Sequence, residues 1–159
     1  MTRVEFSELC KMIQAAYPRD VFIEQKEQYD LWWNMLNGCS FEFAKLAVKN
    51  YILDSRYLPN ISDIMTRYDA VKADALQKKM NLKEIFCFTR DLYPQAFRGS
   101  DSETIYWTLI KSKTYGECLS KAESIKKWSA DYVRRMEKSG SDNWMSLEEC
   151  MTEAVNERG

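Results

Sequence analysis

Signals that start and stop helices recur along this chain at short intervals and favour helices throughout. Thr2 and Glu5 form a Thr-x-x-Glu capping pattern, and Pro18 ends the same segment, because the residue before a proline avoids the helical region. Between these signals, apolar residues such as Leu9 and Ile13 fall at helical spacing. Only 5 glycines and 3 prolines occur in 159 residues, and most stand between periodic segments. The chain is therefore predicted to be all-α.

The same criteria predict a compact bundle of about eight helices. In order, the expected helices cover residues 3–17, 24–37, 41–52, 61–79, 82–92, about 103–110, 116–138 and from 147 onward. Asn81 is interpreted as the cap that separates the fourth helix from the fifth. We expect one helical unit over residues 1–80 and a second over 81–159, the second with a short flexible C-terminus that begins near Thr152.

The two halves of the chain also share a weak series of matching blocks. In order along the chain, the pairs are Tyr17-Pro18 with Tyr93-Pro94, Leu31-Trp32-Trp33 with Ile105-Tyr106-Trp107, and Tyr51-Ile52 with Tyr132-Val133. The gaps between the blocks differ, and two periods are weak evidence for a repeat. Two interpretations stay open: a tandem duplication that gives two related four-helix units, or coincidence among helices with aromatic cores.

The residue types that carry most catalysis and metal binding are missing or scattered. The chain has no histidine, and its five cysteines are far apart with no Cys-x-x-Cys pair, so neither a zinc site nor a histidine base is expected. No Gly-x-x-x-x-Gly-Lys-Ser/Thr phosphate loop occurs. No apolar run approaches the ~18 residues of a membrane span. We expect no enzyme, no cofactor, no metal and no membrane partner.

Composition describes a soluble globular protein with a balanced charge. Apolar residues make up 45% of the chain, charged residues make up 30%, and the formal net charge is −1. Strong non-specific binding to DNA requires a cationic surface that neutralises phosphates. Weak or absent direct DNA binding is therefore the expectation.

The helix expected over 116–138 carries the densest group of charges and is the candidate partner-binding segment. Its basic residues include Lys126, Lys127, Arg134, Arg135 and Lys138. Two tryptophans complete the candidate set, Trp128 off the apolar stripe of this helix and Trp144 just before the last helix, because exposed tryptophans are typical of interfaces. A solvated helix face and packing between the two halves are the competing interpretations.

Four blocks in the first half, taken together, resemble the N-terminal domain of phage replicative-helicase loader/inhibitor proteins. They are the Tyr17-Pro18 stop, Leu31-Trp32-Trp33-Asn34-Met35-Leu36, the helix that starts at Phe41 with Ala44, Ala47 and Val48, and Leu58-Pro59-Asn60-Ile61-Ser62-Asp63-Ile64. The resemblance covers about residues 5–70. Most of these residues are typical of a core or a helix cap.

This resemblance implies a small non-enzymatic adaptor in phage or prophage DNA replication. Its partner would be a hexameric replicative helicase, held inactive and then released onto an origin with the help of an origin-binding initiator, in the cytoplasm of the bacterial host. The family often has a polar, flexible tail after its helical domain, whereas residues 81–150 are predicted to fold. Two alternatives stay open: a helical nucleic-acid-binding, primosome or regulatory module, and a phage structural or assembly chaperone.

Overall fold

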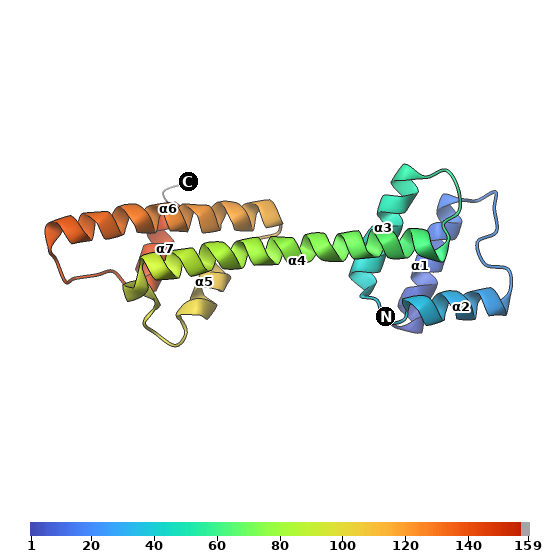
Figure 1. The fold of residues 1–159 in the computed structure, drawn as a ribbon, viewed down its shortest axis with the longest axis horizontal. Helices are drawn as coiled ribbons and strands as arrows, with labels where there is room; N and C mark the ends of the chain where they lie inside the picture. The colour runs from blue at the N-terminus through green and yellow to red at the C-terminus, as the bar shows by residue number, and fades with distance from the viewer. Residues whose placement is uncertain (157–159) are drawn as a thin grey trace. The chain divides into compact units, whose positions relative to one another are not determined.

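A computed structural model describes residues 1–156 of the chain, and every secondary-structure element over these residues is a helix (Figure 1). This confirms the all-α prediction. In order, the elements are α1 (Arg3–Ala16), α2 (Lys26–Leu36), α3 (Phe41–Asp54), α4 (Ile61–Leu92), the short 3-10 helix η1 (Pro94–Phe97), α5 (Ser102–Ile110), α6 (Tyr115–Ser139) and α7 (Leu147–Asn156). The chain divides into unit 1, Met1–Leu76, and unit 2, which begins at Gln77. Each unit has its own hydrophobic core.

Two capping patterns of the sequence form as reciprocal pairs of hydrogen bonds. In α1 the Glu5 amide donates to Thr2 Oγ1 over 3.2 Å, and the Thr2 amide donates to Glu5 Oε2 over 2.6 Å. Asn60 and Asp63 make the same reciprocal pair at the start of α4, at 2.9 and 2.8 Å. Each pair satisfies amide groups that have no partner within the helix.

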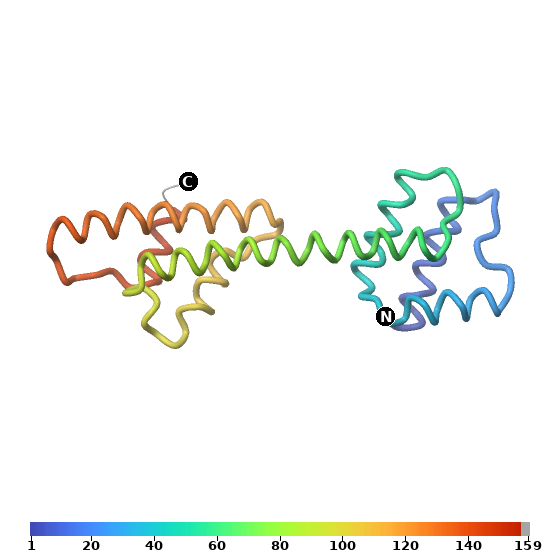
Figure 2. The backbone as a smooth tube through the Cα atoms, viewed as in Figure 1, coloured from blue at the N-terminus to red at the C-terminus, as the bar shows by residue number. Residues whose placement is uncertain are grey.

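The core of unit 1 comes from the apolar stripes of α1, α2 and α3 and from the first turns of α4. Leu9, Ala44 and Ile64 are almost completely buried. Trp32 is buried, whereas its neighbour Trp33 is half-buried, because adjacent residues of a helix point about 100° apart. Figure 2 shows α1 and α3 running in the same direction, and Lys45 of α3 pairs with Glu8 of α1 at 2.7 Å.

One predicted helix boundary is wrong. The expected helices over 61–79 and 82–92 are a single helix, α4, so the structure has seven α-helices over residues 1–156 instead of eight. Asn81 does not cap a helix; its Oδ1 accepts a hydrogen bond of 2.8 Å from Gln77, one turn earlier. No glycine or proline stands between Ile61 and Leu92, and an asparagine costs less than ~1 kcal/mol inside a helix. A local capping signal therefore did not stop the helix.

Unit 2 is built from the second part of α4, η1, α5, α6 and α7. Phe86, Tyr106, Ile125 and Met151 are among its most deeply buried side chains. The second part of α4 and α6 run in the same direction in Figure 1, and Lys126 Nζ of α6 lies 5.5 Å from the ring of Phe88 of α4. The Ser146–Glu149 pair caps α7, with the Ser146 amide 2.9 Å from Glu149 Oε2.

The end of the chain differs from its prediction as far as the structure describes it. Residues 152–156, expected as the start of a loose C-terminus, belong to α7. The physical reason is burial, because Ala154 is 3% exposed and packs in the core of unit 2. Residues 157–159, the rest of that expected segment, lie outside the described residues.

The matched tyrosines of the two halves make corresponding contacts. In unit 1 the Tyr17 hydroxyl donates to the Ser55 carbonyl over 2.9 Å, and Ser55 Oγ donates to the Tyr51 hydroxyl over 3.0 Å. In unit 2 the Tyr93 hydroxyl donates to the Met145 carbonyl over 2.9 Å, and the Met145 amide donates to the Tyr132 hydroxyl over 3.0 Å. In both units one residue of the segment before a capped helix holds two tyrosines, through a serine side chain in unit 1 and a backbone amide in unit 2; the tandem duplication stays a prediction.

Candidate functional site

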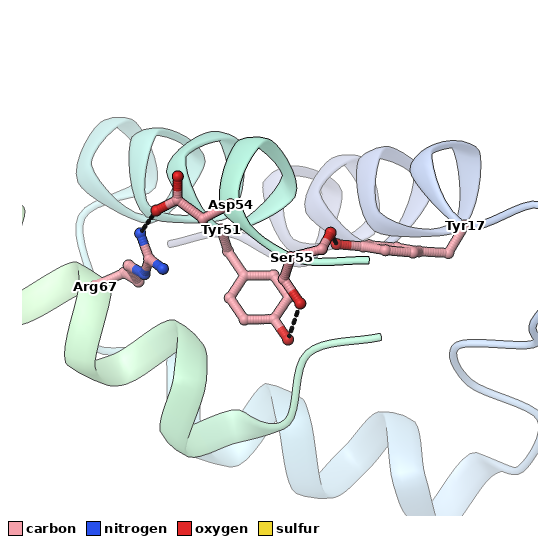
Figure 3. Close-up of polar contacts among 5 residues, drawn as sticks. All are labelled: Tyr17, Tyr51, Asp54, Ser55 and Arg67. Atoms are coloured by element: carbon pink, nitrogen blue, oxygen red, sulfur yellow. Dashed lines mark hydrogen bonds and ion pairs between the residues drawn. The ribbon is translucent and has the colours of Figure 1, made fainter. Parts of the chain in front are cut away.

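One end of unit 1 is held together by a small polar cluster, which Figure 3 shows from the side. This cluster consists of Tyr17, Tyr51, Asp54, Ser55 and Arg67. Through Ser55 it joins the C-terminal ends of α1 and α3, and an ion pair between Arg67 and Asp54 ties the start of α4 to α3. Burial raises the pKa of the Tyr17 hydroxyl, and this hydroxyl donates the hydrogen bond to the Ser55 carbonyl. The cluster therefore fixes the position of the loop over residues 55–60.

Large apolar side chains are exposed around this fixed loop. Leu53 is 74% exposed, Tyr57 is 79% exposed and Val21, on the neighbouring loop between α1 and α2, is 59% exposed. We call these three residues the loop surface. Exposing such side chains to water is unfavourable, and exposed apolar and aromatic residues mark interaction sites when they lie together.

A groove lies beside the loop surface. Phe22, Trp32, Leu58 and Pro59 are among its lining residues, and its volume is about 470 Å³. Val21 directly precedes Phe22 and Tyr57 directly precedes Leu58, so the loop surface and the groove come from the same two chain segments. The Phe22 and Trp32 rings pack edge to face with their centroids 4.8 Å apart.

The five basic residues predicted as a partner site all belong to α6, and Lys127, Arg134 and Lys138 share one face of it. Lys127, Arg134, Arg135 and Lys138 are exposed, and Lys126 is half-buried. Three of these five cations already have a partner within unit 2. Lys126 pairs with Glu123 at 2.8 Å, Arg134 lies 3.6 Å from Asp131, and the Arg135 guanidinium carbon lies 5.8 Å from the centre of the Tyr132 ring.

The two tryptophans of the predicted site occupy different environments. The Trp128 ring is 5% exposed and stacks on Tyr132, with ring centroids 4.9 Å apart. The expectation of an exposed Trp128 is therefore wrong; the apolar face of α6 is wider than its main stripe and includes position 128. Trp144 is half-buried against Tyr93 and Tyr132, so part of its ring remains accessible.

Metal-ligating side chains and cysteine thiols are the remaining groups that could carry chemistry. No group of three histidine, cysteine, aspartate or glutamate side chains within residues 1–156 is placed to hold a metal ion. Burial raises the pKa of the Cys10 thiol to about 11, and it also raises the pKa values of Cys39 and Cys150. These thiols are therefore protonated at neutral pH, whereas a cysteine nucleophile acts as the thiolate. No helix over residues 1–156 is long and apolar enough to span a membrane.

Sequence reasoning missed the loop surface, although one signal for it was present. Tyr57 is an aromatic residue inside a segment that was interpreted as a turn, with no neighbouring apolar stripe to join. Leu53 directly follows Ile52, the last residue of the predicted stripe of α3. Whether such residues fold inward depends on the path of the loop, which tertiary contacts such as Tyr17 to Ser55 decide.

Comparison with known protein families finds a match for the first part of the chain. Residues 1–65 match the family model for the N-terminal domain of the gp39P family of phage helicase loader/inhibitor proteins. The match confirms, for this part of the chain, the resemblance that the sequence blocks indicated. No curated protein and no solved structure matches the chain. The loop surface lies inside the matched segment, whereas α6 lies outside it.

Proposed function

We propose that this protein is a non-enzymatic adaptor in phage or prophage DNA replication that binds a hexameric replicative helicase. The observation that carries the proposal is the match of residues 1–65 to the N-terminal domain of the loader/inhibitor family. The exposed apolar side chains Leu53 and Tyr57 within that segment support a role in protein binding. In this role the protein holds the helicase inactive and delivers it to an origin, where an origin-binding initiator helps to release it, in the cytoplasm of a bacterial host.

Two surfaces are candidates for the helicase contact. The loop surface is favoured because it belongs to the segment that matches the family and because it combines exposed Tyr57 with an apolar groove. The second candidate is α6 with its flank, where Lys127, Arg134 and Lys138 share one exposed face and Lys126, Arg135 and Trp144 complete the predicted set. The α6 face would suit an acidic partner surface, since complementary charge increases association rates.

The first experiment tests complex formation with the helicase. The full chain is mixed with the replicative helicase of its host or phage, with and without ATP, at moderate salt, and is analysed by size-exclusion chromatography with light scattering. We expect a complex of defined stoichiometry whose amount depends on the nucleotide, and no ATP hydrolysis by the adaptor alone. Absence of a complex in both nucleotide states would overturn the proposal.

Matched variants then distinguish the two surfaces. Leu53→Ser with Tyr57→Ser removes apolar groups from the loop surface, and the control Leu31→Ser with Met35→Ser removes a similar exposed area from α2, where the side chains are 56% and 51% exposed. If the loop surface is the contact, the first double variant weakens the complex at least about tenfold, since central interface residues contribute most of the binding energy. The control retains wild-type affinity. Equal losses in both double variants would reject this assignment.

A charge-reversal variant examines the face of α6. Lys127→Glu combined with Arg134→Glu and Lys138→Glu changes three exposed residues on one side of the helix. Loss of the helicase complex in this variant, with the loop variants unaffected, would assign the contact to α6. The same variant tests the alternative of nucleic-acid binding, for which the affinity of the unmodified protein must fall steeply with salt.

A further inference from the structure

A second groove lies entirely within unit 2, outside the segment that matches the family. Its volume is about 470 Å³. Its lining combines the apolar and aromatic groups of Leu82, Trp107 and Tyr115 with the charged groups of Lys78, Lys79, Lys83 and Glu103. The three lysines and Leu82 come from α4, Glu103 and Trp107 come from α5, and Tyr115 is the first residue of α6.

The aromatic part of the groove is held in place by its neighbours. The indole N–H of Trp107 donates a hydrogen bond of 3.1 Å to Glu103 Oε1, one turn earlier on α5. On its other side Trp107 packs against Phe86 and Tyr106, with ring centroids 5.3 Å away in each case. Asn81 Nδ2 lies 3.4 Å from the Tyr115 hydroxyl. The Trp107 and Tyr115 side chains are therefore fixed before any ligand arrives, which lowers the entropy cost of binding.

The edge of the groove along α4 is cationic. Lys79 and Lys83 are exposed and stand one helical turn apart. Over residues 1–156, neither of them forms an ion pair. Lys78 Nζ lies 5.5 Å from the centre of the Tyr115 ring. Two cations at fixed spacing beside an aromatic surface suit a ligand that carries carboxylates next to an apolar side chain.

If the two halves are a tandem duplication, the corresponding position of unit 1 is occupied by the protein itself. Trp33 matches Trp107 in the two halves, and Arg3 stands at the same spacing before Tyr17 as Lys79 does before Tyr93. The Arg3 guanidinium carbon lies 4.3 Å from the centre of the Trp33 ring, and Arg3 Nη1 lies 3.7 Å from Asp30. Unit 2 instead has an exposed lysine at that position and a groove at Trp107.

We propose that the groove formed by Lys79, Lys83, Trp107 and Tyr115 binds an acidic peptide segment of a partner protein through one large apolar side chain. The apolar side chain enters between Leu82 and Trp107, and the flanking carboxylates face Lys79 and Lys83. A nucleic acid fits less well, because the groove offers only the three lysines of α4 to neutralise phosphates, whereas binding of a phosphate backbone depends on many cations. This groove shares no residue with either surface proposed for the helicase.

The test follows the five indole N–H signals of the full chain by NMR, with Trp107→Phe used to assign one of them. Three nonapeptides are titrated, each made of aspartates around a central phenylalanine, leucine or tryptophan. Two control peptides replace the central residue by serine or the aspartates by lysines. We expect the Trp107 signal to shift with at least one acidic apolar peptide and with neither control. No shift of this signal by any of the three at about 1 mM, or an equal shift with the lysine peptide, overturns the proposal.

A pair of charge variants separates the groove from general electrostatics. Lys79→Glu with Lys83→Glu reverses two charges at the groove, and Lys11→Glu with Lys49→Glu reverses two exposed charges in unit 1. We expect the first double variant to weaken binding of the acidic peptide about tenfold or more, with the second close to wild type. Equal weakening by both would overturn the assignment. A Trp107 shift with oligothymidylate but not with the peptides would make the groove a nucleic-acid site instead.

Discussion

Replacing Tyr93 by phenylalanine should destabilise unit 2 without affecting unit 1. Tyr93 is 0% exposed, and its hydroxyl donates to the Met145 carbonyl over 2.9 Å. The Cys150 thiol also lies 3.3 Å from this hydroxyl and 3.8 Å from the same carbonyl. Phenylalanine keeps the ring but removes the oxygen, which leaves the carbonyl with the weaker thiol contact only.

The expected loss is about 1–3 kcal/mol, the cost of leaving a buried polar group without its partner. Native-state amide exchange measures this loss in each unit separately, because exchange rates report the local free energy of opening. Amides of α6 and α7 should exchange about 5- to 150-fold faster in Tyr93→Phe, the factor that corresponds to 1–3 kcal/mol. Amides of α1 and α3 should keep their wild-type rates.

Tyr57→Phe is the matched control, since it removes the same atom from a residue that is 79% exposed. Its effect should stay within about 0.5 kcal/mol. The reasoning would be refuted if Tyr93→Phe lowered the free energy of unfolding no more than this control does. It would also fail if the exchange rates of unit 1 rose together with those of unit 2, because the lost contact involves only residues of unit 2.

Three further predictions concern helix ends and helix continuity. Hydrogen bonds from Ser146 hold the pKa of Glu149 below its ordinary value of 4.5. This carboxylate therefore stabilises α7 at neutral pH, and the contribution is lost as the pH falls through the folded pKa. Glu149→Gln should flatten the decline in stability between about pH 5 and 3, measured by denaturant unfolding. Met80→Pro, inside α4 at a 56% exposed position, should cost about 3 kcal/mol relative to Met80→Ala and lower the helical circular dichroism signal; equal stability of the two variants would mean that the helix is broken near Asn81. Gly140 ends α6 with a φ of 63°, so Gly140→Ala should lower the melting temperature by an amount equivalent to about 1 kcal/mol.

Local patterns predicted the helices well because helix ends depend on nearby residues. Thr2 with Glu5 is a pair within one turn that forms in the structure as the sequence indicated, and Ser146 with Glu149 is a second pair of the same kind. The same local reasoning failed at Asn81, where a capping residue lies inside a continuous helix. A capping residue only permits a helix to start; the helix must also be stopped before it, and no glycine or proline does so there.

The long-range contacts were beyond the reach of periodicity. Tyr17 was recognised only as the residue before a proline, yet its hydroxyl bonds to Ser55, 38 positions away. Trp128 appeared to lie off the apolar stripe of its helix, yet it stacks on Tyr132, one turn further along the same helix, inside the core. This second contact is local: residues four positions apart are neighbours on one helical face, so the predicted stripe was drawn too narrow.

The family blocks explain why the fold is easier to recognise than the binding surface. Trp32 and Pro59 are buried, and Asn60 caps α4 through its bond with Asp63. These positions are constrained by folding alone, so a match that rests on them identifies a domain and leaves its contacts open. Tyr57 lies between the blocks and is exposed, so folding does not constrain it in the same way. If this reasoning holds, Tyr57→Ser changes helicase affinity while leaving the stability of unit 1 within about 0.5 kcal/mol of wild type, whereas Trp32→Ala lowers that stability by about 3–5 kcal/mol.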